Sequence, residues 1–90
     1  MLTYALIVTN KNLKEDIYIK IKQLTQAYLK RLHKVSGEYD LFVELKLQNE
    51  QKMVDVLNKM RNIEGVSILR TFTVIHKTKE HDQVPKSLLY

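Results

Sequence analysis

The sequence predicts an α+β domain in which two helices cover one face of a four-stranded antiparallel sheet. Apolar residues alternate with a period of two in the strand segments and recur with helical spacing in two others. The segments follow the order strand, helix, strand, strand, helix, strand, which is the split βαβ arrangement of ferredoxin-like domains. With 90 residues, the chain has room for one domain and one small core.

The first strand and helix are expected within the first 25 residues. Residues 2–9 alternate but carry apolar groups on both faces, as in a strand that is covered on both sides. Asn12 is the expected N-cap of the helix, with Glu15 three residues later. The helix extends to about Leu24, and its apolar stripe consists of Leu13, Ile17, Ile21 and Leu24.

Residues 25–36 fit two structures. Their apolar residues at a spacing of three could continue the helix, or the segment could form a strand from near Tyr28 to Gly37. We expect the strand, because residues 40–47 alternate cleanly and need an antiparallel neighbour. Gly37 would make the connecting turn, since glycine adopts positive φ at little steric cost.

The second helix and the last strand complete the pattern. Asn49 is the expected N-cap, and the buried stripe of this helix consists of Met53, Val56, Leu57, Met60 and Ile63. Gly65 stands where a left-handed cap is expected. Residues 66–76 are rich in β-branched and aromatic residues and predict the last strand. The domain is therefore expected at 1–76, followed by a C-terminal tail at 77–90.

Composition argues against most enzymatic and metal chemistry. There are no cysteines, and His33, His76 and His81 lack the spacing of metal ligands. Two isolated glycines do not make a phosphate-binding loop. We expect no catalytic residue, no metal and no cofactor, with a small dimeric α+β barrel enzyme as the less favoured alternative. No apolar run is long enough to cross a membrane, so a cytoplasmic protein without membrane contact is expected.

The predicted fold leaves one face of the sheet open. Phe42 and other apolar groups are expected on that face, opposite the helices. Because monomers rarely expose a large apolar face, the pattern predicts a two-fold dimer with the open faces together.

The charge distribution is compatible with nucleic-acid binding. The net charge is +5, and no acidic residue lies between Asp16 and Glu38. A basic ferredoxin-like domain could bind nucleic acid by stacking bases on strand aromatics such as Tyr4, Phe42 and Phe72. The basic-glycine-aromatic signature of such domains is missing. Nucleic-acid binding therefore stays open only as an alternative function.

The stretch Leu29 to Ile75 resembles the effector-binding domain of the Lrp/AsnC family, and with the first strand and helix the resemblance covers residues 2–76. The first matching motif is an apolar pair placed before Gly-x-Tyr-Asp, at Leu29, Val35, Gly37, Tyr39 and Asp40. The second is an apolar helix that ends in Gly-Val before a Thr-x-Thr strand, at Ile63, Gly65, Val66 and Thr71. The chain departs from the family at Asn10-Lys11-Asn12, where Pro-Gly is common, and at Leu69, the position of the first threonine.

The resemblance implies a function in amino-acid sensing. In such proteins, free amino acids bind at contacts between dimers, next to the Gly-x-Tyr-Asp loop. The candidate ligand-binding residues here are Gly37, Glu38, Tyr39, Asp40 and Thr71. Full-length members carry a helix-turn-helix domain before this one, whereas this chain begins at the first strand. We therefore expect a stand-alone effector domain without direct DNA binding, which forms homodimers or larger homo-oligomers or co-assembles with helix-turn-helix relatives.

Overall fold

The computed structural model describes residues 1–74 and contains four strands and two helices in the predicted order. The elements are β1 (Leu2–Thr9), a 3-10 turn η1 (Lys11–Leu13), α1 (Lys14–Thr25), β2 (Leu29–Lys34), β3 (Leu41–Lys46), α2 (Glu50–Arg61) and β4 (Val66–Thr73). All neighbouring strands are antiparallel, in the order β2-β3-β1-β4. This order confirms the ferredoxin-like fold.

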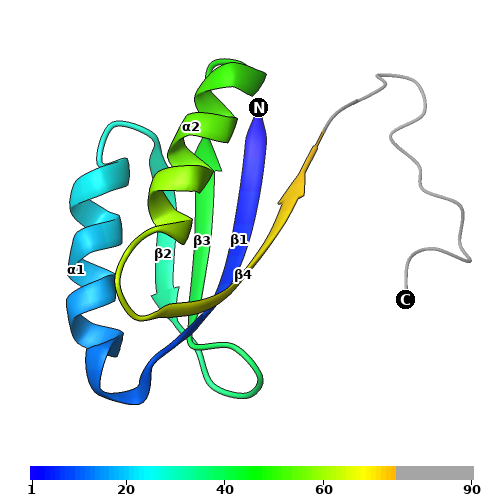
Figure 1. The fold of residues 1–90 in the computed structure, drawn as a ribbon. Coiled ribbons are helices and arrows are strands. Elements are labelled where there is room, and N and C mark those ends of the chain that lie inside the picture. The colour runs from blue at the N-terminus through cyan, green and yellow to red at the C-terminus, as the bar shows by residue number, and fades with distance from the viewer. Residues whose placement is uncertain (75–90) are drawn as a thin grey trace, which may run out of the picture.

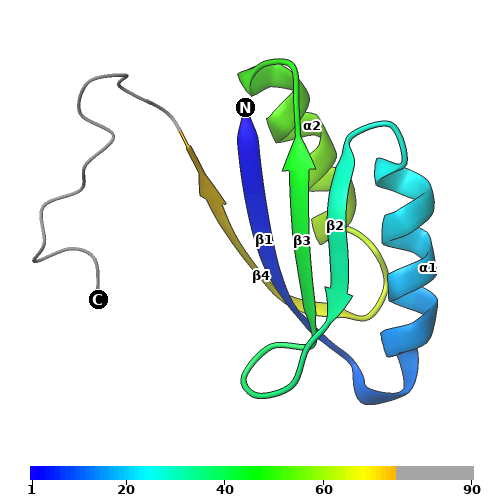
Figure 2. The same cartoon turned by 180° about the vertical axis from the view of Figure 1, so that it is seen from behind.

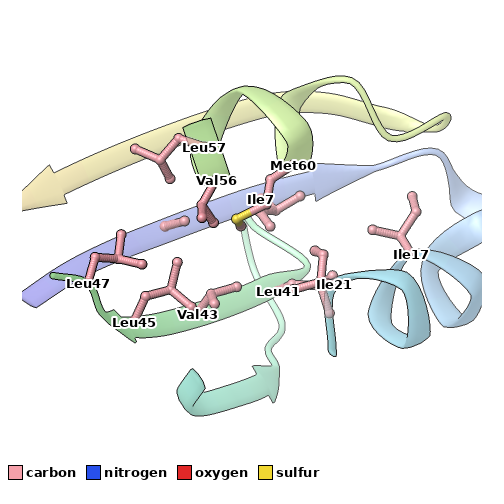
Figure 3. Packing of buried hydrophobic residues seen from close by; sticks show 11 residues of the cluster. Ile7, Ile17, Ile21, Leu41, Val43, Leu45, Leu47, Val56, Leu57 and Met60 are labelled. Carbon is pink, nitrogen blue, oxygen red and sulfur yellow. The ribbon is translucent and has the colours of Figure 1, made fainter. Parts of the chain in front are cut away.

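Both helices lie on one face of the sheet (Figure 1), and no helix crosses in front of the strands in the opposite view (Figure 2). The alternation of β1 explains the core on the helix side, because its odd-numbered residues from Thr3 to Thr9 are all buried. The core comprises Ala5, Ile7, Ile17, Ile21, Leu41, Val43, Leu45, Leu47, Val56, Leu57 and Met60 (Figure 3). The even-numbered residues of β1 point to the open face and are partly exposed, so within one protomer β1 is covered on one side only.

Residues 25–36 fitted either a helix or a strand, and the structure shows the expected strand of a hairpin there. β2 begins at Leu29 and ends at Lys34, three residues before Gly37, and it pairs with β3. Gly37 has a φ of 110°, which confirms the predicted positive-φ turn.

One predicted N-cap is confirmed and the other is wrong. Gly65 has the predicted positive φ, but it does not cap α2, because that helix ends at Arg61 with Asn62 as its C-cap. The Asn49 side chain accepts a hydrogen bond from the Lys52 backbone N–H at 2.8 Å, which caps α2. Asn12, however, does not cap α1. The chain first makes the turn η1, whose cap is Asn10, and α1 begins at Lys14 without a side-chain cap. The turn places Asn12 inside η1, where its side chain cannot take the capping position.

The last strand begins as predicted at Val66 but ends at Thr73, so Val74, which the prediction placed in the strand, lies just beyond it. The final residues of the predicted strand, 75 and 76, and the predicted tail at 77–90 lie outside the described residues.

Gly65 fixes the approach of β4 to α1. Its φ is 97°, and its carbonyl accepts a hydrogen bond from the Asn10 N–H at 2.7 Å. A Cβ added at Gly65 would lie 2.7 Å from Leu13 Cδ1 and 2.9 Å from Ile17 Cδ1, whereas one at Gly37 would meet no atom within 4 Å. Gly65 is therefore required by both backbone conformation and space, and Gly37 by conformation alone.

Replacing each glycine with alanine should separate the requirement for positive φ from the requirement for space. Gly37→Ala should cost about 1–2 kcal/mol of stability through left-handed strain. Gly65→Ala should cost about 1–3 kcal/mol more, because the new methyl group overpacks the contact with α1. Urea unfolding of both variants measures the difference, and an equal loss in the two would contradict this account.

Candidate functional site

The loop that carries the Gly-x-Tyr-Asp motif joins β2 to β3 and projects at the bottom of Figure 1. Two backbone hydrogen bonds close its base. The Val35 N–H donates to the Asp40 carbonyl at 2.9 Å, and the Asp40 N–H donates to the Ile7 carbonyl at 2.8 Å. The second bond ties the loop to the central strand, so the loop has a fixed base on the sheet.

The Asp40 carboxylate fastens the loop to the end of β1. Its Oδ2 accepts from the Thr9 backbone N–H at 2.7 Å and from the Thr9 hydroxyl at 3.2 Å. Its Oδ1 lies 4.0 Å from Lys14 Nζ, and the same ammonium donates to the Val35 carbonyl at 3.4 Å. One side chain of the motif thus links the loop, β1 and α1, a structural function that the motif alone did not reveal.

The other motif residues leave polar groups accessible. Gly37 and Glu38 are exposed and Tyr39 is half-buried. Among the described residues, no ion pair engages the Glu38 carboxylate and no hydrogen bond engages the Tyr39 hydroxyl. The open space at Gly37 leaves its backbone approachable. This part of the loop can offer an acid, a hydroxyl and backbone groups to a small polar molecule.

The structure does not bring Thr71 to this loop within one protomer. Thr71 pairs with Ala5 on one side of β1, whereas Asp40 bonds to Ile7 on the other. Two strand spacings and two residues along the strand separate the two backbones by roughly 12 Å. Four of the five candidate residues therefore lie together, and the fifth lies apart.

The second candidate surface is the open face, which we define as the outward-facing residues of the four strands. Its apolar and aromatic members are Leu2, Tyr4, Leu6, Val8, Phe42, Ile68 and Phe72. Two of them are strongly exposed, Ile68 at 45% and Phe72 at 57%. The Phe42 ring lies 6.0 Å from that of Tyr4 and 6.2 Å from the stacked imidazole of His33. The predicted exposure of an apolar sheet face around Phe42 is confirmed.

A polar cluster lies within the open face. The Tyr4 hydroxyl donates to Glu44 Oε2 at 3.1 Å, and Arg31 Nε lies 3.3 Å from Glu44 Oε1. The hydrogen bond to Glu44 raises the pKa of Tyr4, partial burial and the Glu44 charge raise it further, and Arg31 opposes the shift. Sequence reasoning missed this cluster, because the three residues come together only through the strand pairing.

The described part of the chain supports neither a metal site nor a membrane-spanning helix. Between residues 1 and 74 no group of three or more His, Cys, Asp or Glu side chains could hold a metal ion. Neither α1 nor α2 has the length and apolar character needed to cross a bilayer.

The sheet order, the paired helices and the Gly37 loop are those of a small ferredoxin-like α+β domain. A family model described as the Lrp/AsnC ligand binding domain matches residues 20–84, well over half of the sequence. The chain therefore belongs to this family of ligand-binding domains. Among curated proteins, none matches the chain.

Solved structures share the fold. TTHA0845 from Thermus thermophilus has a TM-score of 0.76 at 22% identity, covering 87% of this chain and 96% of that one. E. coli AsnC has a TM-score of 0.72 at 15% identity, over 84% of this chain and 51% of AsnC. The feast or famine regulatory protein from M. tuberculosis, complexed with L-methionine, has a TM-score of 0.67 at 13% identity, over 92% and 55%.

Removal of the Asp40 carboxylate should destabilise the domain. Asp40→Ala leaves the buried Thr9 N–H without its acceptor, which should cost about 1–3 kcal/mol. Glu38→Ala, in the same loop but exposed, should change stability by less than about 0.5 kcal/mol. Chemical denaturation of both variants checks the pair, and similar losses would argue against a fastening function of Asp40.

The polar cluster of Tyr4, Glu44 and Arg31 predicts that the stability of the domain depends on pH through the titration of Tyr4. Because the folded-state pKa of Tyr4 is raised above 10.0, its stabilising effect is complete below pH 10.0 and is lost as the pH rises through the raised pKa. Glu44→Gln should lower the Tyr4 pKa toward 10.0, since it removes the carboxylate. An NMR titration of the tyrosine rings measures this, with Glu50→Gln as the control. An unchanged Tyr4 titration in Glu44→Gln would contradict the assignment.

Proposed function

We propose that this domain is a regulatory module that senses a small amino acid and acts as a dimer or a larger assembly. Membership of a ligand-binding family supports the sensing function. The single observation that carries the proposal is the loop at residues 37–40, which is fixed at its base and chemically open at its tip. The L-methionine bound to the M. tuberculosis regulator, a protein with the same fold, indicates the class of effector.

The residues of the loop fit the two charged ends of an amino acid. In our proposal the exposed Glu38 carboxylate accepts from the ligand ammonium through a charge-assisted hydrogen bond. The backbone at Gly37 and the Tyr39 hydroxyl meet the remaining polar atoms. Asp40 Oδ1, which has only the 4.0 Å contact to Lys14, is a second acceptor for the ammonium, while Oδ2 stays on Thr9.

Thr71 enters the proposed site only through a second protomer. Within one protomer, Thr71 lies on the far side of β1 from the loop. A ligand held by the loop of one protomer and by Thr71 of another would link binding to assembly. Such a link would let an amino acid regulate the protein by changing its oligomeric state.

The proposed assembly uses the open face. A face that exposes Ile68 and Phe72 is stabilised when a second sheet covers it. The same surface would allow co-assembly with helix-turn-helix relatives, and the domain would then act on DNA through its partners.

Calorimetry against the proteinogenic amino acids tests the sensing function. One or a few should bind with a Kd of about 10 μM to 1 mM, as expected for a ligand with few heavy atoms. Glu38→Gln should weaken that binding by about tenfold, because a charged hydrogen bond is lost. Glu50→Gln, at the opposite end of the sheet, should have no effect. If no amino acid gives a heat of binding at millimolar concentration, the proposed sensing function is contradicted.

A further inference from the structure

The loop of the proposed site offers acids but no positive charge of its own. Residues 35–40 include Glu38 and Asp40 and contain no lysine, arginine or histidine. A free amino acid at neutral pH carries a carboxylate as well as an ammonium. Placed against this loop alone, its carboxylate would be repelled by both acids. A cation from another element of the fold is therefore needed to hold that end of the ligand.

Lys14, the first residue of α1, brings such a cation to the loop. Its Nζ donates to the Val35 carbonyl at 3.4 Å and lies 4.0 Å from Asp40 Oδ1. The second distance is too long for a hydrogen bond, and a lysine ammonium has three donors. The Lys14 side chain is 35% exposed. The ammonium is thus held against the base of the loop and keeps donors for a molecule that arrives from solvent.

The other lysine at this end of the hairpin is turned toward α1. Lys34 Nζ forms an ion pair with Glu15 and lies 4.9 Å from the centre of the Tyr18 ring. Within residues 1–74, Lys14 is the only basic side chain that a hydrogen bond or an ion pair links to residues 35–40. The contacts therefore single out Lys14 as the cation of the loop.

We infer that Lys14 binds the carboxylate of the amino-acid effector, while Asp40 Oδ1 accepts from its ammonium. This inference rests on the proposed sensing function and adds a residue of α1 to the site. The two charged groups of an α-amino acid are attached to the same carbon, and Lys14 Nζ and Asp40 Oδ1 are opposite charges 4.0 Å apart. The ligand can therefore meet both, each through a charge-assisted hydrogen bond.

A structural function of Lys14 predicts a different result from a binding function. Because Lys14 also holds the Val35 carbonyl, its loss disturbs the base of the loop. Such a disturbance weakens the binding of every ligand alike. The loss of a carboxylate-binding group, in contrast, weakens only the ligands that carry a carboxylate. The two functions are therefore separated by comparing an amino acid with its primary α-amide.

Calorimetry with both kinds of ligand makes this comparison. Each proteinogenic amino acid that binds the wild type is titrated again as its α-amide at about pH 6, where the amines of both are protonated. The wild type should bind the amide about tenfold more weakly, since the carboxylate charge is lost. Lys14→Met should bind the amino acid about tenfold more weakly than the wild type does, and the amide equally well, so the preference disappears.

Two further variants serve as controls. Lys20→Met removes the same charge from an exposed position of α1 and should keep the tenfold preference of the wild type. Lys14→Arg keeps the charge and should also retain a preference for the amino acid.

Three outcomes would overturn the inference and leave the sensing function intact. The first is a wild type that binds amino acid and amide equally well, a result that requires no variant. The second is a Lys14→Met variant that keeps the tenfold preference. The third is an equal weakening of both ligands in Lys14→Met, which assigns Lys14 a structural function only. If no amino acid binds the wild type, the sensing function fails and the inference fails with it.

Discussion

β1 lies in the middle of the sheet, hydrogen-bonded to β3 on one side and to β4 on the other, and its two faces meet different surroundings. One face packs under α1 and α2 and supplies fully buried residues such as Ala5 and Ile7. The other lies on the open face. Two helices of 12 residues each cover one side of this sheet and cannot cover both. This constraint leaves an apolar surface exposed, and the proposed assembly follows from it.

The same strand also positions the loop. The Ile7 carbonyl and the Thr9 backbone N–H, both near the end of β1, receive the backbone and the carboxylate of Asp40. Because the base of the loop is held by hydrogen bonds to a buried strand, its tip can expose polar groups without unfolding the hairpin. The glycine turn and the aspartate thus have separate functions. Gly37 permits the backbone path, and Asp40 fixes that path to the sheet.

The type and order of the elements could be predicted from periodicity, because alternation and helical spacing are local properties. The positive φ at Gly37 and Gly65 could also be predicted, since a chain with two glycines uses them at turns. The first helix cap could not be, because η1 shifts the start of α1 beyond Asn12. Contacts between distant segments were also beyond sequence reasoning. The bond from Thr9 to Asp40 spans 31 positions, and that from Tyr4 to Glu44 spans 40. Both depend on the strand register, which no local pattern specifies. The separation of Thr71 from the loop has the same origin, since it follows from the place of β4 on the far side of β1.

The central claim is that another sheet covers the open face in solution, and a fluorescent reporter on that face tests it most directly. The chain has no tryptophan, so Phe72→Trp introduces a single probe there, and Val54→Trp places one on the helix side, where Val54 is 42% exposed. As the protein concentration rises, the emission of Phe72→Trp should shift to shorter wavelength while that of Val54→Trp stays constant. A Phe72→Trp emission that remains solvent-exposed while the molecular mass doubles would contradict the claim.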